Sequence, residues 1–159
     1  MKKRNVSFLV TLALGSVLLL QACSKDNMGS GQTPVEQGFI KVKLTDLPGP
    51  YPEVNIDIRQ VRVHLAGSAG NDGWIDLPTH AGVYNLLDLQ NGIDSTIVDS
   101  TMIQAGKITQ VRLVLGPNST VMTSDSVLHD LKVPSGEQSG VKLVGPLNVP
   151  VDHTLHVLI

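Results

Sequence analysis

From Gly38 onward, apolar and polar residues alternate, and this period of two constrains the fold more than any other feature of the sequence. Residues 39–44, FIKVKL, place Ile40, Val42 and Leu44 at even-numbered positions. Because successive side chains of a strand point to opposite faces, this alternation predicts a β-strand with one buried face. An amphipathic helix needs a period of 3.6, and no window shows a convincing one. The sequence therefore predicts an all-β domain.

The alternation changes phase once. The apolar residues of 54–58 have even numbers, whereas those of 61–65 have odd numbers, and the polar residues Asn55 and Asp57 fall on the other face of the first segment. A slip of one residue moves a whole set of side chains to the opposite face of a sheet. We therefore predict a β-bulge or a bend near Arg59 and Gln60.

Several further apolar segments are separated by clusters of Gly, Pro, Asn and Ser that favour turns. Many short strands with regular turns are typical of a sandwich, so we expect an antiparallel β-sandwich with Greek-key connections, transthyretin- or immunoglobulin-like, over residues 38–159. The sequence still alternates at Leu155, Val157 and Ile159, and we therefore expect the domain to be truncated at its C-terminus. Besides the strands above, we predict strands at 74–77, 83–89, 96–103, 107–115, 127–133, 141–144 and 154–159.

The first 22 residues have the pattern of an export signal. A basic start, residues 2–4, precedes an apolar run at 8–20 that is shorter than the roughly 20 residues of a membrane-spanning helix. The residues Leu20-Gln21-Ala22-Cys23 resemble the lipobox of bacterial lipoproteins, in which the cysteine is lipidated and the signal is cut before it. We expect a signal peptide at 1–22, a lipid anchor on Cys23, and a flexible tether at 23–37 rich in Gly, Ser and Gln.

The residue after Cys23 bears on localisation. Ser24 is not the aspartate that retains lipoproteins at the inner membrane in the best-studied Gram-negative sorting rule, so we expect the outer membrane, on its periplasmic face or at the cell surface. Cleavage removes three basic residues and no acidic one, which leaves nine basic and 14 acidic residues. This acidic balance disfavours nucleic acid as a partner. We expect the lipid anchor to contact the membrane and the domain to meet a protein or glycan of the envelope.

Motifs for catalysis are weak. Ser139 and Lys142 have the S-x-x-K spacing of penicillin-binding enzymes, but that spacing brings the two side chains together on a helix, and here the surroundings predict turn and strand. His153 and His156 have the same spacing, and no residues have the spacing of a known metal site. We therefore expect no enzymatic activity, no metal and no cofactor, with an envelope hydrolase as an alternative.

Five residues are candidates for ligand binding. Asp46 ends the first strand beside a proline-rich loop, and Trp74 follows a Gly-rich loop, where we expect its ring to anchor the core rather than to form a platform for a sugar. Ser135, Gln138 and Lys142 belong to or follow the segment PSGEQSG. That segment fits a recognition loop or a structural turn, and we favour the turn because glycine adopts positive φ readily.

Three Asp-Ser dipeptides suggest a covalent modification. Each is followed by Thr or Val, and the resulting tripeptides resemble the acceptor for O-glycosylation in one phylum of Gram-negative bacteria. Asp-Ser pairs also form turns, which is the alternative explanation. The candidate acceptors are Ser95, Ser100 and Ser126.

Several short segments occur in a fixed order along residues 38–159. They are Leu44-Thr45-Asp46, Gly73-Trp74, residues 85–89, Ala105-Gly106, Gln110-Val111-Arg112-Leu113 and residues 134–142. Together they resemble a family of bacterial and archaeal lipoproteins known only as a domain of unknown function, family 4382. The resemblance implies a β-rich exported domain without an assigned activity or catalytic residues. That family continues with an Asp-Phe-Asp segment after the last strand, which this sequence does not reach.

Together these features predict a lipid-anchored envelope protein that displays a β-sandwich with a binding or structural role. The first alternative is a pilus or adhesin subunit that assembles by adding a strand to an open sheet edge, for which the alternating C-terminal segment 154–159 would be the donor. The sequence does not identify the ligand.

Overall fold

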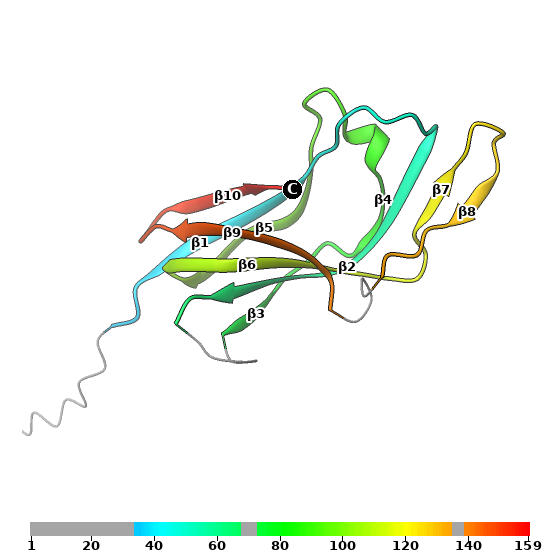
Figure 1. Cartoon of the computed structure of the whole chain (residues 1–159). Coiled ribbons are helices and arrows are strands. Elements are labelled where there is room, and N and C mark those ends of the chain that lie inside the picture. Colours follow the sequence, from blue (N-terminus) through cyan, green and yellow to red (C-terminus); the bar gives the residue numbers. More distant parts are fainter. Residues whose placement is uncertain (1–33, 68–72, 135–138) are drawn as a thin grey trace, which may run out of the picture. The chain divides into compact units, whose positions relative to one another are not determined.

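The computed structural model describes residues 34–67, 73–134 and 139–159. The predicted signal peptide, Cys23, most of the predicted tether, Ser135 and Gln138 lie outside the described residues. No helix among the described residues is long and apolar enough to cross a membrane. The described strands are β1 (Gln37–Leu44), β2 (Glu53–Leu65), β3 (Trp74–Leu77), β4 (Gly82–Asn85), β5 (Ser95–Gln104), β6 (Gly106–Leu115), β7 (Thr120–Met122), β8 (Leu128–Asp130), β9 (Val141–Val149) and β10 (Thr154–Leu158), with the 3-10 helix η1 (Leu86–Leu89) between β4 and β5 (Figure 1).

These strands form two sheets, which confirms the predicted all-β sandwich. The small sheet has the order β10-β1-β5, and the large sheet has the order β8-β7-β2-β6-β9, with β3 and β4 also paired to β2. The core between them is aliphatic, and its members at 0% exposure include Ile40 and Val42 of β1, Val98 of β5 and Ile108 of β6. Burial of such side chains away from water is what holds the two sheets together.

One strand pair departs from the predicted antiparallel arrangement, because β10 runs parallel to β1. The chain leaves β9 through a tight turn at residues 150–153, in which Asp152 has a φ of 57° and donates its backbone N–H to Gln37 O at 2.9 Å. The backbone N–H of Phe39 donates to His153 O at 2.8 Å. The turn therefore carries the chain from the large sheet to the edge of β1 in the direction of β1 itself.

The long strand β2 is the central element of the large sheet. Its first half lies between β4 and β7, and its second half lies between β3 and β6. The register with β6 shifts between Ile58 and Gln60, which confirms the bulge predicted from the change of phase. On each side of the shift the apolar residues face the core, since Ile58, Val61 and Val63 are all fully buried.

A buried carboxylate lies next to this bulge, contrary to the alternation, which placed Asp57 on a polar face. Asp57 is only 1% exposed, and its Oδ2 accepts from Arg59 Nη2 at 2.8 Å and from Asn118 Nδ2 at 2.9 Å. Its backbone N–H donates to Ser119 Oγ at 3.0 Å. These four residues form what we call the Asp57 cluster. Burying a charge is tolerated when it is paired and hydrogen-bonded, as it is here.

Gly116 allows the Asp57 cluster to form. The turn from β6 to β7 folds back onto β2, and the backbone N–H of Gly116 donates to Asp57 O at 2.7 Å. A Cβ atom on residue 116 would collide with the Asp57 carboxylate and with Arg59 Nε. Only glycine permits this close approach of backbone to side chain.

Three predicted strands need new boundaries, and one strand was missed. Residues 86–89 form η1 rather than strand, because the Asn85 side chain accepts from the backbone N–H of Leu87 at 3.2 Å and caps a helical turn. It also accepts from Val54 N at 3.3 Å, which fixes the turn against β2. The strand predicted at 127–133 is limited to β8, β9 continues through Gly145 and Pro146 to residue 149, and β7 was not predicted because it is only three residues long.

Candidate functional site

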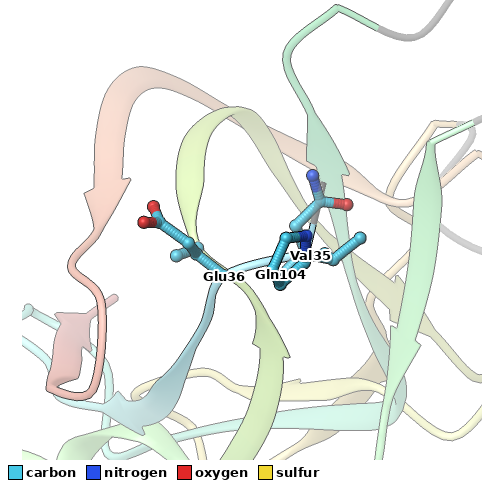
Figure 2. Close-up of a pocket in the computed structure, with 5 residues that line it drawn as sticks. Val35, Glu36 and Gln104 are labelled. Carbon is cyan, nitrogen blue, oxygen red and sulfur yellow. The ribbon is translucent and has the colours of Figure 1, made fainter. Parts of the chain in front are cut away.

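A surface hollow lies at the start of β1, but its lining lacks a group of polar side chains that could bind a ligand together. It is lined by Pro34, Val35, Glu36, Gln104 and Ala105, and it is widely open. Glu36 is its only ionisable lining residue, and Figure 2 shows the Glu36 carboxylate directed away from Gln104. Because no polar groups converge in the hollow, we do not assign it a binding role.

The face of β3, β2, β6 and β9 that is turned away from the core presents a different set of side chains. We call it the outer face. In an antiparallel sheet, residues directly opposite each other share a face. The register places Asp76, Arg62, Arg112 and Lys142 side by side across the four strands. A second line, two residues away from the first along each strand, consists of Trp74, His64, Gln110 and Val144.

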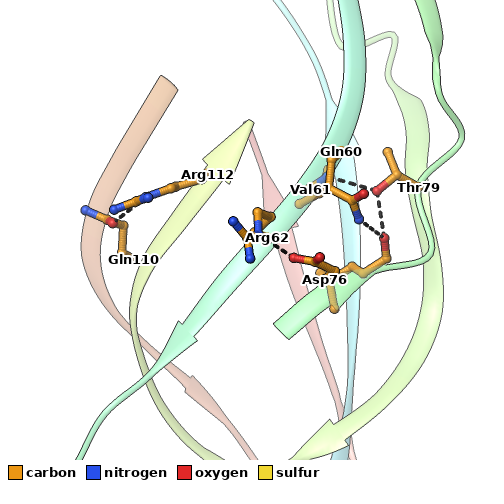
Figure 3. A network of polar contacts seen from close by, with 8 residues as sticks. Gln60, Val61, Arg62, Asp76, Thr79, Gln110 and Arg112 are labelled. Atoms are coloured by element: carbon orange, nitrogen blue, oxygen red, sulfur yellow. Dashed lines mark hydrogen bonds and ion pairs between the residues drawn. The ribbon is translucent and has the colours of Figure 1, made fainter. Parts of the chain in front are cut away.

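The first line holds three adjacent cations, Arg62, Arg112 and Lys142, which we call the basic row. Arg62 Nε donates to the Asp76 carboxylate, so one of the three charges is paired (Figure 3). Neither Arg112 nor Lys142 forms an ion pair with any residue that the structure describes. Like charges directly opposite each other destabilise a sheet, so the basic row is an electrostatic cost to the fold.

Trp74 lies on the outer face and not in the core, so the expectation that it anchors the core is wrong. The Arg112 guanidinium carbon lies 4.0 Å from the centroid of the Trp74 ring, and that of Arg62 lies 5.6 Å from it. The ring of His64 meets it edge-on, with 4.9 Å between centroids and 61° between planes. The half-buried indole of Trp74 therefore forms cation–π contacts with both guanidinium groups. These contacts are energetically favourable, and they orient the two arginine side chains.

The guanidinium of Arg112 is held on two sides and open on others. Its Nε donates to Gln110 Oε1 at 2.9 Å (Figure 3), and its central carbon lies over the Trp74 ring. Arginine carries five N–H donors, so four on the two Nη atoms are left. Among the described residues, none accepts a hydrogen bond from them. The arrangement can therefore accept a bidentate oxyanion such as a carboxylate.

A bulge in β6 shapes the middle of the outer face. The register of β6 with β2 shifts between His64 and Leu65, which pair with Gln110 and Ile108, so Thr109 is the extra residue. Thr109 Oγ1 lies 3.1 Å from His64 Nδ1 and donates to His64 O at 3.3 Å. Thr109 thus joins His64, Trp74, Gln110 and Arg112 around a shallow depression of about 290 Å³. Bulges often occur next to functional sites because they redirect side chains.

Of the ligand-binding residues predicted from the sequence, the structure brings two to the outer face. Trp74 and Lys142 belong to its two lines, whereas Asp46 lies elsewhere, after β1, where its backbone N–H donates to Leu89 O at 3.0 Å. Ser135 and Gln138 lie outside the described residues. The sequence analysis did not select Arg62, His64 or Arg112. The signal for the two arginines was a repeated pattern, Gln-Val-Arg followed by an aliphatic residue, at 60–63 and 110–113.

The residues considered for catalysis do not converge. Ser139 lies in a turn before β9, whereas Lys142 belongs to β9 and is exposed. His153 Nδ1 contacts Val151 O at 2.8 Å in the turn that precedes β10, and His156 is exposed on β10. Among the described residues, no group of three or more His, Cys, Asp or Glu side chains is placed to hold a metal ion.

The three candidate acceptors for O-glycosylation have different surroundings. Ser100 is exposed on β5, Ser95 is half-buried at the start of that strand, and Ser126 is exposed in the β7–β8 turn with a φ of 65°. In that turn a hydrogen bond from Thr123 lowers the pKa of Asp125 below its usual value. Ser100 and Ser126 are therefore the accessible members of the set.

Comparison with known protein families gives a match over most of the chain. A family model described as Domain of unknown function (DUF4382) matches residues 37–159. No curated protein and no solved structure matches the chain. The matched range covers both sheets and the whole outer face.

Proposed function

We propose that this chain, which belongs to the family DUF4382, is a lipid-anchored protein of the cell envelope whose β-sandwich binds a ligand on the outer face of its large sheet. One observation carries the binding role: three cations lie in one row beside a half-buried tryptophan, and among the described residues only one of the three, Arg62, has a carboxylate partner. A surface that only covered the core would have no reason to keep that arrangement, because the row costs stability.

The lipid anchor is proposed from the sequence. The lipobox-like residues 20–23 end at the only cysteine of the chain, and an apolar run precedes them. Each buried CH₂ group of a lipid chain contributes about 0.8 kcal/mol to membrane binding, and stable anchoring needs more than one chain. A cysteine that carries several acyl chains would therefore hold the domain at the outer membrane, with residues 24–36 as a spacer between lipid and β1.

Replacement of the proposed lipidated cysteine tests this part of the function. When the full chain is made in its native bacterium, we expect it to enter the detergent phase of a nonionic detergent extraction, and we expect Cys23→Ala to move it to the aqueous phase. Ser24→Ala, one residue away, is the control and leaves the protein in the detergent phase. Recovery of the unaltered protein in the aqueous phase, with no change on Cys23→Ala, contradicts the anchor. Protease treatment of intact cells then separates surface display from a periplasmic location.

The two alternative functions have less support. A pilus subunit that donates its last strand needs that strand to be free, but β10 pairs with β1 over five residue pairs and Val157 is 9% exposed in the core. An envelope hydrolase needs titratable side chains that converge on one point, and in the described part of the chain Ser139, His153 and His156 do not. The binding role is therefore the function that the geometry supports best.

A further inference from the structure

We infer that the ligand of the outer face is an acidic polysaccharide, whose carboxylate or sulfate groups are bound by the basic row. This inference rests on the proposed binding function. Three features carry it. Two concern the described residues, among which only Asp76 pairs with a cation of the row and none uses the Nη donors of Arg112. The third is the pair of polar side chains, His64 and Gln110, in the middle of the second line.

The positive charge of the basic row favours an anionic ligand. Arg112 lies directly opposite Arg62 on one side and directly opposite Lys142 on the other, so each neighbour has the same sign. Asp76 compensates Arg62 at the end of the row, and Lys142 is exposed at the other end. A negative ligand group over Arg112 would interact favourably with all three cations and relieve their mutual repulsion. The chain is otherwise acidic, which makes this concentration of positive charge local.

Arg112 is oriented before any ligand arrives. Gln110 accepts from its Nε, and the Trp74 ring supports its plane, so the side chain loses little freedom when it binds. Stacking uses the face of a guanidinium and leaves its N–H edge open. A carboxylate or sulfate can therefore take two parallel hydrogen bonds from the Nη atoms without disturbing the contact with Trp74.

The dimensions of the outer face suit a polymer. Adjacent strands are about 4.8 Å apart, so the basic row extends over about 10 Å, comparable to a disaccharide. Thr109, Gln110 and His64 lie alongside and offer hydroxyl, amide and imidazole groups to sugar hydroxyls. The depression is shallow rather than enclosed, which fits a segment of an extended chain better than a small molecule that must be buried.

An anionic membrane surface fits the outer face less well. Aromatic residues that insert into lipid present a free apolar face, but the Trp74 ring is covered by the Arg112 guanidinium at 4.0 Å. Its neighbours His64 and Gln110 are polar. We therefore argue for a polysaccharide, and binding to lipid becomes one outcome of the test.

The test measures binding of defined oligomers to the full chain, purified in detergent, by isothermal titration calorimetry. The probes are trigalacturonate, which is carboxylated, a sulfated galactan oligomer and neutral maltotriose. We expect at least one acidic oligomer to bind, maltotriose not to bind, and added salt to weaken the binding. The preference between the first two probes identifies the anionic group.

Three charge-removing variants locate the binding. Arg112→Gln is expected to weaken binding of the acidic oligomer at least tenfold, because it removes a charged bidentate donor. Lys142→Gln is expected to weaken it about threefold, since a single exposed charge contributes less. Lys132→Gln removes the same charge from an exposed position outside the outer face, and it is expected to leave the affinity within a factor of about two. Thermal melting of each variant checks that the fold is retained, and Lys142→Gln cannot disturb the core because its side chain is exposed.

Several results would overturn the inference. Binding of maltotriose with the same affinity as the acidic oligomers shows that the anionic group is not recognised. A loss of affinity on Lys132→Gln as large as that on Arg112→Gln shows that the electrostatic attraction is not specific to the outer face. Binding to vesicles of anionic phospholipid, lost on Arg112→Gln and not accompanied by binding of the oligomers, assigns the surface to lipid. Absence of binding to both acidic oligomers at millimolar concentration also rejects the polysaccharide. In each case the detergent partition of Cys23→Ala is unaffected, so anchoring is judged separately.

Discussion

Gly116→Ala is expected to lower the free energy of unfolding by about 3 kcal/mol, because the added methyl group collides with a buried carboxylate. The Cβ atom would overlap the Asp57 carboxylate and Arg59 Nε. The Arg59 side chain is half exposed and can move toward solvent, but the Asp57 side chain is buried and cannot withdraw without breaking its hydrogen bonds to Arg59 and Asn118. For a domain of this size we expect the melting temperature to fall by about 10 °C. Chemical and thermal denaturation, followed by circular dichroism, measure both quantities.

Gly145→Ala is the matched control for this substitution. Gly145 lies within β9, and a Cβ atom there meets nothing within 4 Å. The same chemical change is therefore expected to alter the stability by no more than about 0.5 kcal/mol. If the two variants unfold alike, the close approach of the β6–β7 turn to Asp57 is not what requires glycine at position 116.

Ile40→Ala is expected to destabilise the domain by about 3 to 4 kcal/mol, since it empties a fully buried site. Ile40 is 0% exposed in β1, the middle strand of the small sheet, and it pairs with Leu155 on one side and with Thr101 on the other. A three-stranded sheet has few apolar side chains that pack against the larger sheet. The loss of one such side chain therefore weakens the packing of the whole small sheet against the core.

Lys41→Ala, at the next position of β1, serves as the comparison because its side chain points away from the core. We expect a change of at most about 0.5 kcal/mol, measured by urea denaturation with an unchanged slope. A loss below about 1 kcal/mol for Ile40→Ala would contradict the packing of the small sheet against the large one.

Much of the fold is readable in the sequence because the alternation is strong and local. The period of two located β1 and β2, and the change of phase after Ile58 located the bulge. The parallel pairing of β1 with β10 has no such signal, since it depends on a turn near residue 152 and on strands distant in sequence. The helix η1 was missed because its capping by Asn85 was not weighed against the apolar content of residues 86–89.

The Asp57 cluster shows the limit of reasoning from alternation. The pattern assigned Asp57 to a polar face, and a strand does present it away from Ile58. What covers that face is the turn from β6 to β7, which brings Asn118 and Ser119 onto Asp57 from 60 residues further along the chain. Such covering depends on the tertiary structure, and period alone does not encode it.

The candidate site was predicted in part. Trp74 and Lys142 were selected as single residues, but the sequence analysis did not place them on one surface, and it assigned the Trp74 ring to the core. The neighbours that give these residues a role come from β2 and β6, and only the register shows that Arg62 and Arg112 are directly opposite. Sheet register, rather than any motif, assembles the outer face.

The pairing of β1 with β10 also sets the order in which the domain can assemble. β1 is made first and can pair with β5 on one edge, but on its other edge Phe39 and Ile40 find partners only when Thr154 and Leu155 have been synthesised. Strand pairs so distant in sequence raise the contact order and slow folding. A nascent chain of this kind therefore keeps one edge of its leading strand open until residues 154–158 have been made.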